Sequence, residues 1–145
     1  MIIKTYGDER LPKILGLHPM MANGESMLRL AGSLRERYCV IAPDLTGQGE
    51  DSGTFVSAEA EAKTLHDWLL KKGWTRLELI YGASLGASVA LELMAMTDLE
   101  VGTAVFDGCP LYKNAPFLKW MMTTVFLKKH RKAARVPELA NQRMT

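Results

Sequence analysis

The stretch that decides the fold is residues 77–94, LELIYGASLGASVALELM. An apolar run at 77–81 is followed at once by GASLG at 82–86, and then by apolar residues at helical spacing. The pattern predicts a strand that turns directly into a helix, with Ser84 between two glycines at the turn. Gly-x-Ser-x-Gly in this setting is typical of a nucleophilic serine on a tight elbow.

The two glycines have a steric reason. Side chains at Gly82 and Gly86 would collide with the turn that holds Ser84, so we expect that both positions require glycine. The helix that follows directs its first N–H groups and the positive end of its dipole at the same spot, where an oxyanion would develop. The alternative is a closely packed strand-to-helix turn in which Ser84 is only the N-cap.

Strands and helices alternate along most of the chain. This alternation predicts an α/β fold with a doubly wound, mostly parallel sheet and helices on both faces. We expect a helix to begin at Ser84 and Ser57 to cap the helix before it. The expected strands are 1–6, 13–17, 39–42, 76–81 and 101–106, and the other expected helices are 25–38 and 58–72.

Two loops carry further signals. Residues 14–24, ILGLHPMMANG, place His-Pro-Met directly after a strand, and residues 40–53, VIAPDLTGQGEDSG, follow the next strand. Together with the elbow they resemble the α/β-hydrolase family, in which one strand ends in His-Gly-x and the next is followed by Asp-x-x-Gly-x-Gly-x-Ser. The resemblance covers roughly residues 13–110 and implies the N-terminal half of that fold.

The resemblance also implies roles for single residues. Ser84 would be the nucleophile, and the backbone N–H groups of Leu85 and Met20 would bind the oxyanion. Pro19 stands where the family usually has glycine, and it has no N–H to donate. Gln48 stands where the family commonly has histidine, a change that we expect to be harmless.

His18 and Asp44 could be mistaken for catalytic residues, but we expect both to be structural. They stand at positions that organise the loops in the family, so we expect His18 to form hydrogen bonds with nearby backbone. A catalytic base would instead have to reach the serine hydroxyl.

The general base and the acid are harder to find. The order Ser84, Asp107, His130 agrees with that of the family. Asp107 ends the strand after the nucleophile helix and is a candidate acid, although a turn residue that binds backbone is the alternative. His130 lies in the charged run KKHRK, which is typical of a solvated helix face. We therefore expect the catalytic histidine outside this chain, together with the acid unless Asp107 supplies it, and the fold to be truncated after strand 101–106.

The last part of the chain differs in charge from the rest. Residues 117–145 hold seven Lys/Arg against one Asp/Glu, whereas residues 1–116 hold 11 against 15. We interpret 1–116 as the core and 117–145 as the start of a helical cap region. A helix predicted over 117–135 could cover a pocket, pack against a missing partner or bind a membrane surface.

The predicted function is that of a carboxylesterase-like hydrolase acting on a small acyl ester or thioester. A catalytically incomplete fragment or a non-catalytic binding protein is the alternative, because no convincing base lies in the chain. No phosphate loop, metal-ligand cluster or dinucleotide fingerprint is present, so we expect no cofactor and no metal.

Charge and hydropathy limit the partners. The net charge of +2 gives no reason to expect nucleic acid. No signal peptide and no apolar run of spanning length is found, so we expect a cytoplasmic protein without a membrane anchor. An exposed edge at strand 101–106 would favour pairing with a second copy, which predicts a homodimer.

Overall fold

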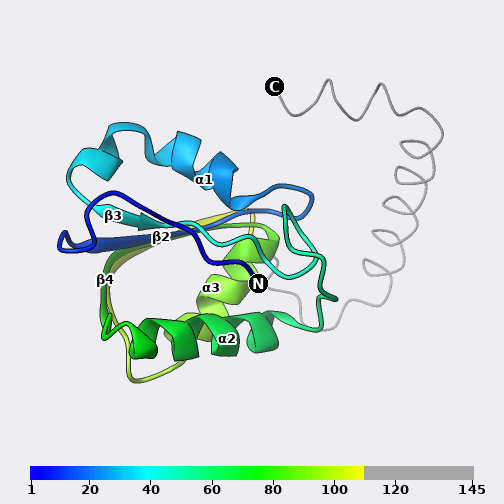
Figure 1. Cartoon of the computed structure of the whole chain (residues 1–145). Coiled ribbons are helices and arrows are strands. Elements are labelled where there is room, and N and C mark those ends of the chain that lie inside the picture. Colours follow the sequence, from blue (N-terminus) through cyan, green and yellow to red (C-terminus); the bar gives the residue numbers. More distant parts are fainter. Residues whose placement is uncertain (110–145) are drawn as a thin grey trace. The chain divides into compact units, whose positions relative to one another are not determined.

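A mostly parallel β-sheet forms the centre of the fold (Figure 1). The computed structural model describes residues 1–109, and in that part the sheet has five strands in the order β1-β3-β2-β4-β5. β1 runs antiparallel to β3, and the other neighbours pair in parallel. The parallel α/β sheet expected from the sequence is confirmed. The strands are β1 Thr5–Tyr6, β2 Lys13–Leu17, β3 Cys39–Ile41, β4 Arg76–Ala83 and β5 Glu100–Asp107.

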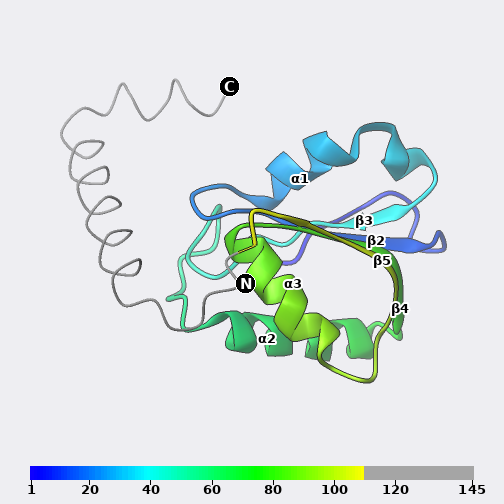
Figure 2. The same ribbon diagram turned by 180° about the vertical axis from the view of Figure 1, so that it is seen from behind.

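Helices cover both faces of this sheet. The helix α1 lies on one face, and α2 and α3 lie on the other, as both views show (Figures 1 and 2). The doubly wound arrangement is therefore confirmed. Within residues 1–109 no helix is long and apolar enough to cross a bilayer. The helices are α1 Gly24–Ala31, the 3-10 helix η1 Gly32–Glu36, α2 Ala58–Lys71 and α3 Leu85–Met94.

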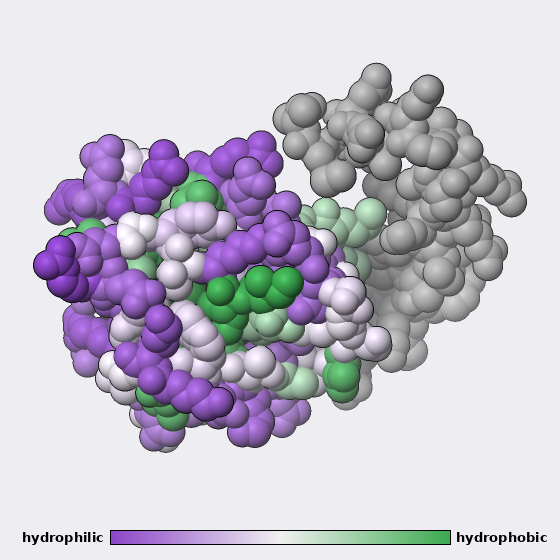
Figure 3. Space-filling view, in the orientation of Figure 1, coloured by the Kyte–Doolittle hydropathy of each residue, from purple (hydrophilic) through white to green (hydrophobic). Residues whose placement is uncertain are grey.

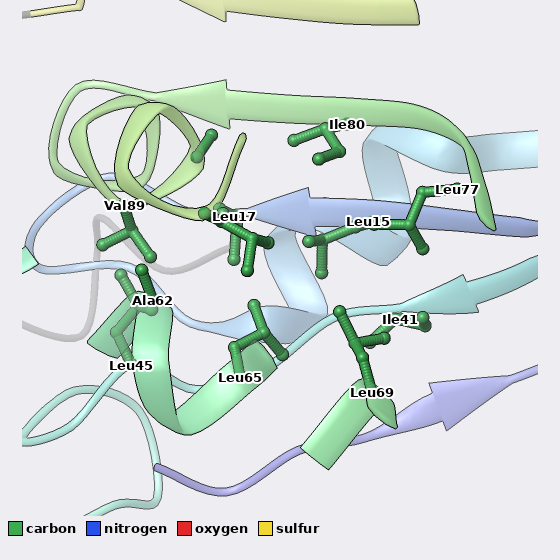
Figure 4. Packing of buried hydrophobic residues seen from close by; sticks show 12 residues of the cluster. Leu15, Leu17, Ile41, Leu45, Ala62, Leu65, Leu69, Leu77, Ile80 and Val89 are labelled. Atoms are coloured by element: carbon green, nitrogen blue, oxygen red, sulfur yellow. The ribbon is translucent and has the colours of Figure 1, made fainter. Parts of the chain in front are cut away.

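The main core lies between the sheet and the pair α2 and α3. Leu65 and Leu69 of α2 point toward Leu15 and Leu17 of β2 (Figure 4), and all four side chains are fully buried or nearly so. Burying a leucine side chain stabilises a fold by roughly 1.5 to 3 kcal/mol. This packing fixes β2 and β4 as rigid supports for the loops that follow them.

The helix predicted over 25–38 is wrong in its second half. The α-helix ends at Ala31, because Gly32 adopts a φ of 49° that no continuing helix has, and the tighter helix η1 follows. The apolar spacing persists through this segment, so spacing alone does not reveal the break.

Strand and cap boundaries were predicted more closely. Ser57 Oγ accepts the Ala60 N–H at 3.1 Å, so the predicted N-cap of α2 is confirmed. The predicted strand 1–6 is shorter, because only Thr5–Tyr6 pairs with β3 and Ile2 makes an isolated bridge to Asp44.

The face shown in Figure 3 is mostly hydrophilic, with hydrophobic residues in small patches. This agrees with a core that holds most of the large apolar side chains. The predicted boundary after residue 116, the predicted helix over 117–135 and His130 lie outside the described residues.

Candidate active site

The candidate groups come together at one edge of the sheet. Because β2, β3, β4 and β5 run in parallel, their carboxyl ends meet there. Met20 follows β2, Asp44 follows β3, Ser84 follows β4 and Asp107 ends β5. In open α/β sheets this is the edge where ligands bind.

Ser84 sits in a strained turn between β4 and α3. Its φ is 48° and its ψ is −108°, a conformation that non-glycine residues rarely adopt. The residue is exposed, and its side chain makes no capping hydrogen bond to α3. Ser84 therefore stands at the N-cap position of α3 without using its hydroxyl as a cap.

Backbone hydrogen bonds hold the strained residue in place. The Ser84 N–H donates to the Asp107 carbonyl oxygen at 2.8 Å, which joins the elbow to the end of β5. The Ser84 carbonyl oxygen accepts the N–H groups of Ala87 and Ser88 at 3.1 and 3.2 Å, which starts α3. Strain of this kind persists only where the surroundings enforce it.

Both glycines of the elbow are places of close approach. A Cβ on Gly82 would lie 2.7 Å from Ala87 Cα, and one on Gly86 would overlap the carbonyl of Leu17 in β2. Gly82 thus lets the chain fold back on itself, and Gly86 lets α3 lie against the end of β2. The predicted collision with the turn itself is found at Gly82, whereas at Gly86 the close neighbour is the end of β2.

The loop after β2 begins beside this elbow. The sheet register pairs Leu17 with Gly82, so Pro19 and Ser84 both lie two residues beyond that pair. Pro19 to Ala22 form a turn in which the Ala22 N–H donates to the Pro19 carbonyl oxygen at 3.2 Å. Met21, the third residue of the turn, has a φ of 66°.

Among the backbone N–H groups at this edge, those of Met20, in the turn after β2, and of Leu85, the first residue of α3, have no acceptor within residues 1–109. The N–H groups of a helix's first turn have no partner inside the helix and bind anions readily. The arrangement offers one donor from each of two neighbouring strand ends.

His18 is a structural residue. It is fully buried, and its Nε2 accepts the Leu45 N–H at 3.0 Å, so Nδ1 carries the proton and donates to the Pro19 carbonyl oxygen at 2.8 Å. Burial lowers the pKa of the imidazole, and the Pro19 bond and Asp44 offset this only in part. With both ring nitrogens engaged, His18 has none left for Ser84.

Asp44 organises the loops around it. Its buried carboxylate accepts the Gly24 N–H at 2.7 Å and the Glu50 N–H at 3.1 Å, and it pairs with Lys4 at 3.3 Å. Burial alone would raise the pKa of this carboxyl, but the hydrogen bonds from Gly24, Glu50 and Lys4 outweigh it and the pKa is lowered. Asp44 therefore joins three segments of the chain, and its carboxylate is not available as a catalytic acid.

Two further polar side chains support this edge and were not predicted. Gln48 Oε1 accepts the Met21 N–H at 2.8 Å, and the buried Glu61 of α2 accepts the Thr46 N–H at 2.9 Å. No spacing pattern joins these pairs, which are 27 and 15 residues apart. From its position near the start of a helix, Glu61 would be interpreted only as a local capping residue.

The carboxylate of Asp107 is exposed at the end of β5. Its Oδ2 accepts the Tyr81 hydroxyl at 3.0 Å, across the pair of strands β4 and β5. Burial raises the pKa of the tyrosine, and the neighbouring carboxylate raises it further. Asp107 is therefore more than a turn residue that binds backbone, although no histidine contacts it within residues 1–109.

The remaining histidine of this part is remote from the elbow. His66 lies on α2, where Nδ1 is 3.6 Å from Asp67 and Nε2 is 3.6 Å from Asp98. No contact found among residues 1–109 joins it to Ser84. In the same part of the chain, no group of three His, Cys, Asp or Glu side chains is placed to hold a metal ion.

Sequence comparison agrees with this geometry. The model of the alpha/beta hydrolase family matches residues 14–143, nearly the whole chain. The chain belongs to the alpha/beta hydrolase family. The sheet with α1 on one face and α2 and α3 on the other is the portion of the alpha/beta hydrolase fold that it carries. No curated protein matches the sequence.

Solved structures show the same fold. An alpha/beta hydrolase family protein from Desulfitobacterium hafniense is 30% identical with a TM-score of 0.70, over 74% of this chain and 44% of that chain. A structure described as a lipase from Acinetobacter baumannii is 27% identical with a TM-score of 0.67, over 81% and 41%. An esterase of a marine microorganism, at 19% identity and a TM-score of 0.72 over 88% and 50%, shares the fold. The chain spans about half or less of these alpha/beta hydrolases.

Proposed function

We propose that this alpha/beta hydrolase is a serine hydrolase in which Ser84 attacks the carbonyl carbon of a small acyl ester or thioester. The observation that carries the proposal is the elbow itself. Ser84 is held at φ 48°, exposed and free of any capping role, at the edge of the sheet where ligands bind. A turn that needed only packing would have no reason to keep a non-glycine residue in that conformation.

The reaction would proceed by acyl transfer. Ser84 Oγ bonds to the carbonyl carbon while its proton passes to a general base, and the carbonyl oxygen becomes an oxyanion. The Met20 and Leu85 N–H groups would donate to that oxyanion, helped by the positive end of α3. The alcohol or thiol then leaves with the proton, and water hydrolyses the acyl-serine by the same steps in reverse.

The base would come from outside residues 1–109. His18 is engaged through both nitrogens, and His66 lies on α2 away from the elbow. Asp107 remains our candidate acid, because its main chain bonds to Ser84 and its carboxylate lies at the same edge. His130 is the histidine of the chain that lies beyond the described residues.

The proposed acyl substrate rests on the apolar side chains beside the elbow. Met20 and Met21 are 45% and 58% exposed beside the elbow, and flexible apolar side chains of this kind suit an acyl group. Solved relatives described as a lipase and an esterase agree with an ester substrate. We place such an enzyme in the cytoplasm, as expected from the sequence.

The test compares hydrolysis of p-nitrophenyl esters of increasing acyl length by the protein that includes its general base and by the Ser84→Ala and Ser88→Ala variants of that protein. We expect Ser84→Ala to lose at least about a thousandfold in kcat/KM, because loss of a nucleophile leaves only residual catalysis. Ser88→Ala, which removes a hydroxyl from the nearby helix α3, should retain full activity. Equal turnover by wild type and Ser84→Ala would exclude Ser84 as the nucleophile.

The second candidate function is ligand binding without catalysis. One observation favours it, since neither histidine of residues 1–109 is available as a base. NMR titration with an unreacted ester would separate the two. Shifts at Met20 and Leu85 without any product would favour binding, and product release would favour the hydrolase.

A further inference from the structure

The turn after β2 has an unusual conformation for its residues. In the turn from Pro19 to Ala22, the third residue, Met21, has a φ of 66°. A positive φ at this position is the mark of a type II turn, which normally takes glycine or asparagine there. A methionine in that place requires support from outside the turn.

Two side chains supply hydrogen bonds to the turn. The buried His18 donates from Nδ1 to the Pro19 carbonyl oxygen at 2.8 Å, and Gln48 accepts the Met21 N–H at 2.8 Å. Gln48 belongs to the loop after β3, and its own backbone is fixed there. Its N–H donates to Leu45 at 2.8 Å and its carbonyl oxygen accepts from Asp51 at 3.0 Å.

The bonds to the Pro19 carbonyl determine where the Met20 N–H points, and the bond to Gln48 fixes the peptide that follows. The Pro19 carbonyl and the Met20 N–H belong to one planar trans peptide, so they point in opposite directions. His18 and the Ala22 N–H hold the carbonyl on one side, which leaves the Met20 N–H directed to the other. The next peptide, between Met20 and Met21, is the one that differs between turn types I and II. Gln48 holds that peptide in the type II form.

We propose that Gln48 is a positioning residue for the oxyanion-binding loop. Its carboxamide oxygen keeps Met21 in the left-handed conformation and ties the turn that carries the Met20 N–H to the loop after β3. Without this acceptor, a form with negative φ at Met21 becomes available and the loop samples two conformations. Preorganised donors stabilise a developing oxyanion better than mobile ones. The inference rests on the proposed role of Met20, but its structural part can be tested without activity.

The first experiment is NMR on the full chain. Gln48→Met has similar length but no strong acceptor, Gln48→Glu keeps an acceptor oxygen, and Ser52→Ala changes an exposed residue of the same loop. In Gln48→Met we expect the Met21 amide to exchange with water roughly two- to tenfold faster, the range for loss of one hydrogen bond. The strong NOE from Met20 Hα to the Met21 amide, which marks a type II turn, should weaken. Gln48→Glu and Ser52→Ala should keep both signals of the wild type.

The second experiment is kinetic. If the wild type hydrolyses p-nitrophenyl esters, Gln48→Met should lower kcat by about tenfold with unchanged KM and melting temperature, because donors act mainly on the transition state. Unchanged exchange and NOE in Gln48→Met would overturn the proposal. A loosened turn with unchanged kcat would also overturn it, since Gln48 would then be structural only. A wild type without turnover would count against the proposed function, and the NMR result would still decide whether Gln48 holds the turn.

Discussion

At the scale of single residues, His18 explains how a histidine close to the elbow can be structural. Its ring joins the turn after β2 to the loop after β3, with Nδ1 donating to Pro19 and Nε2 accepting from Leu45. Only the neutral imidazole can make both bonds, because the protonated ring is a donor at both nitrogens. The fold therefore depends on His18 staying neutral.

This dependence predicts how stability changes with pH. Burial lowers the pKa of His18 in the folded state, so the unfolded chain binds the proton first as the pH falls below about 6.5. The free energy of unfolding should therefore decrease from about pH 7 toward about pH 5. Asp44, whose pKa is also lowered, should cause a separate loss of stability only below about pH 4.

The substitution His18→Leu tests this assignment in urea unfolding experiments. It leaves the buried Leu45 N–H without an acceptor, so we expect a loss of about 1 to 3 kcal/mol near neutral pH. The decrease between about pH 7 and about pH 5 should largely disappear. An unchanged pH dependence in the variant would assign the effect to another group.

At the scale of elements, the contact between β2 and the first turn of α3 supports the elbow between β4 and α3. Gly86 lies so close to the Leu17 carbonyl that any side chain would overlap it. We expect Gly86→Ala to move α3 away from β2 and to cost about 1 to 3 kcal/mol, the usual cost of overpacking. Thermal unfolding measures this loss.

Gly73→Ala is the matched control for this element. Unlike Gly86, Gly73 has a positive φ, 69°, and a Cβ there would meet no atom within 4 Å. It should therefore cost only the conformational strain, roughly 1 kcal/mol. A smaller loss for Gly86→Ala than for Gly73→Ala would contradict the close approach at the elbow.

The elements also show what the sequence could predict. β2, β4 and α3 follow from runs of apolar residues and from the glycines around Ser84, because these patterns report local geometry. The break at Gly32 could not be predicted, since the apolar spacing continues through it and a single glycine is tolerated in helices. Gln48 and Glu61 bind backbone of distant loops, and such contacts depend on a tertiary arrangement that leaves no periodic trace.

At the scale of the whole molecule, the sheet has a long edge. In the described part β5 pairs only with β4, over eight residues, and its central residues 101–106 carry no charge. Val105 and Phe106 are 43% and 37% exposed. An uncharged edge of this length is a template for pairing with another strand.

The expected homodimer is therefore a testable prediction. Wild-type protein should show a concentration-dependent dimer in analytical ultracentrifugation, and Val105→Lys should be monomeric because a charge on an edge strand opposes pairing. Lys63→Ala changes the charge on α2 and not on the edge strand β5, and it serves as a control. If the wild-type protein stays monomeric at every concentration measured, the prediction of a homodimer is wrong.

The central claim is that Ser84 is an activated nucleophile, and its most direct test is mass spectrometry after treatment with a fluorophosphonate probe. This probe labels serines whose hydroxyl is activated by a base and whose oxyanion is stabilised. In protein that includes the general base, we predict one adduct per chain, mapped to Ser84 and absent from Ser84→Ala. An unlabelled protein of this kind, or a label that persists in Ser84→Ala, would exclude Ser84 as an activated nucleophile.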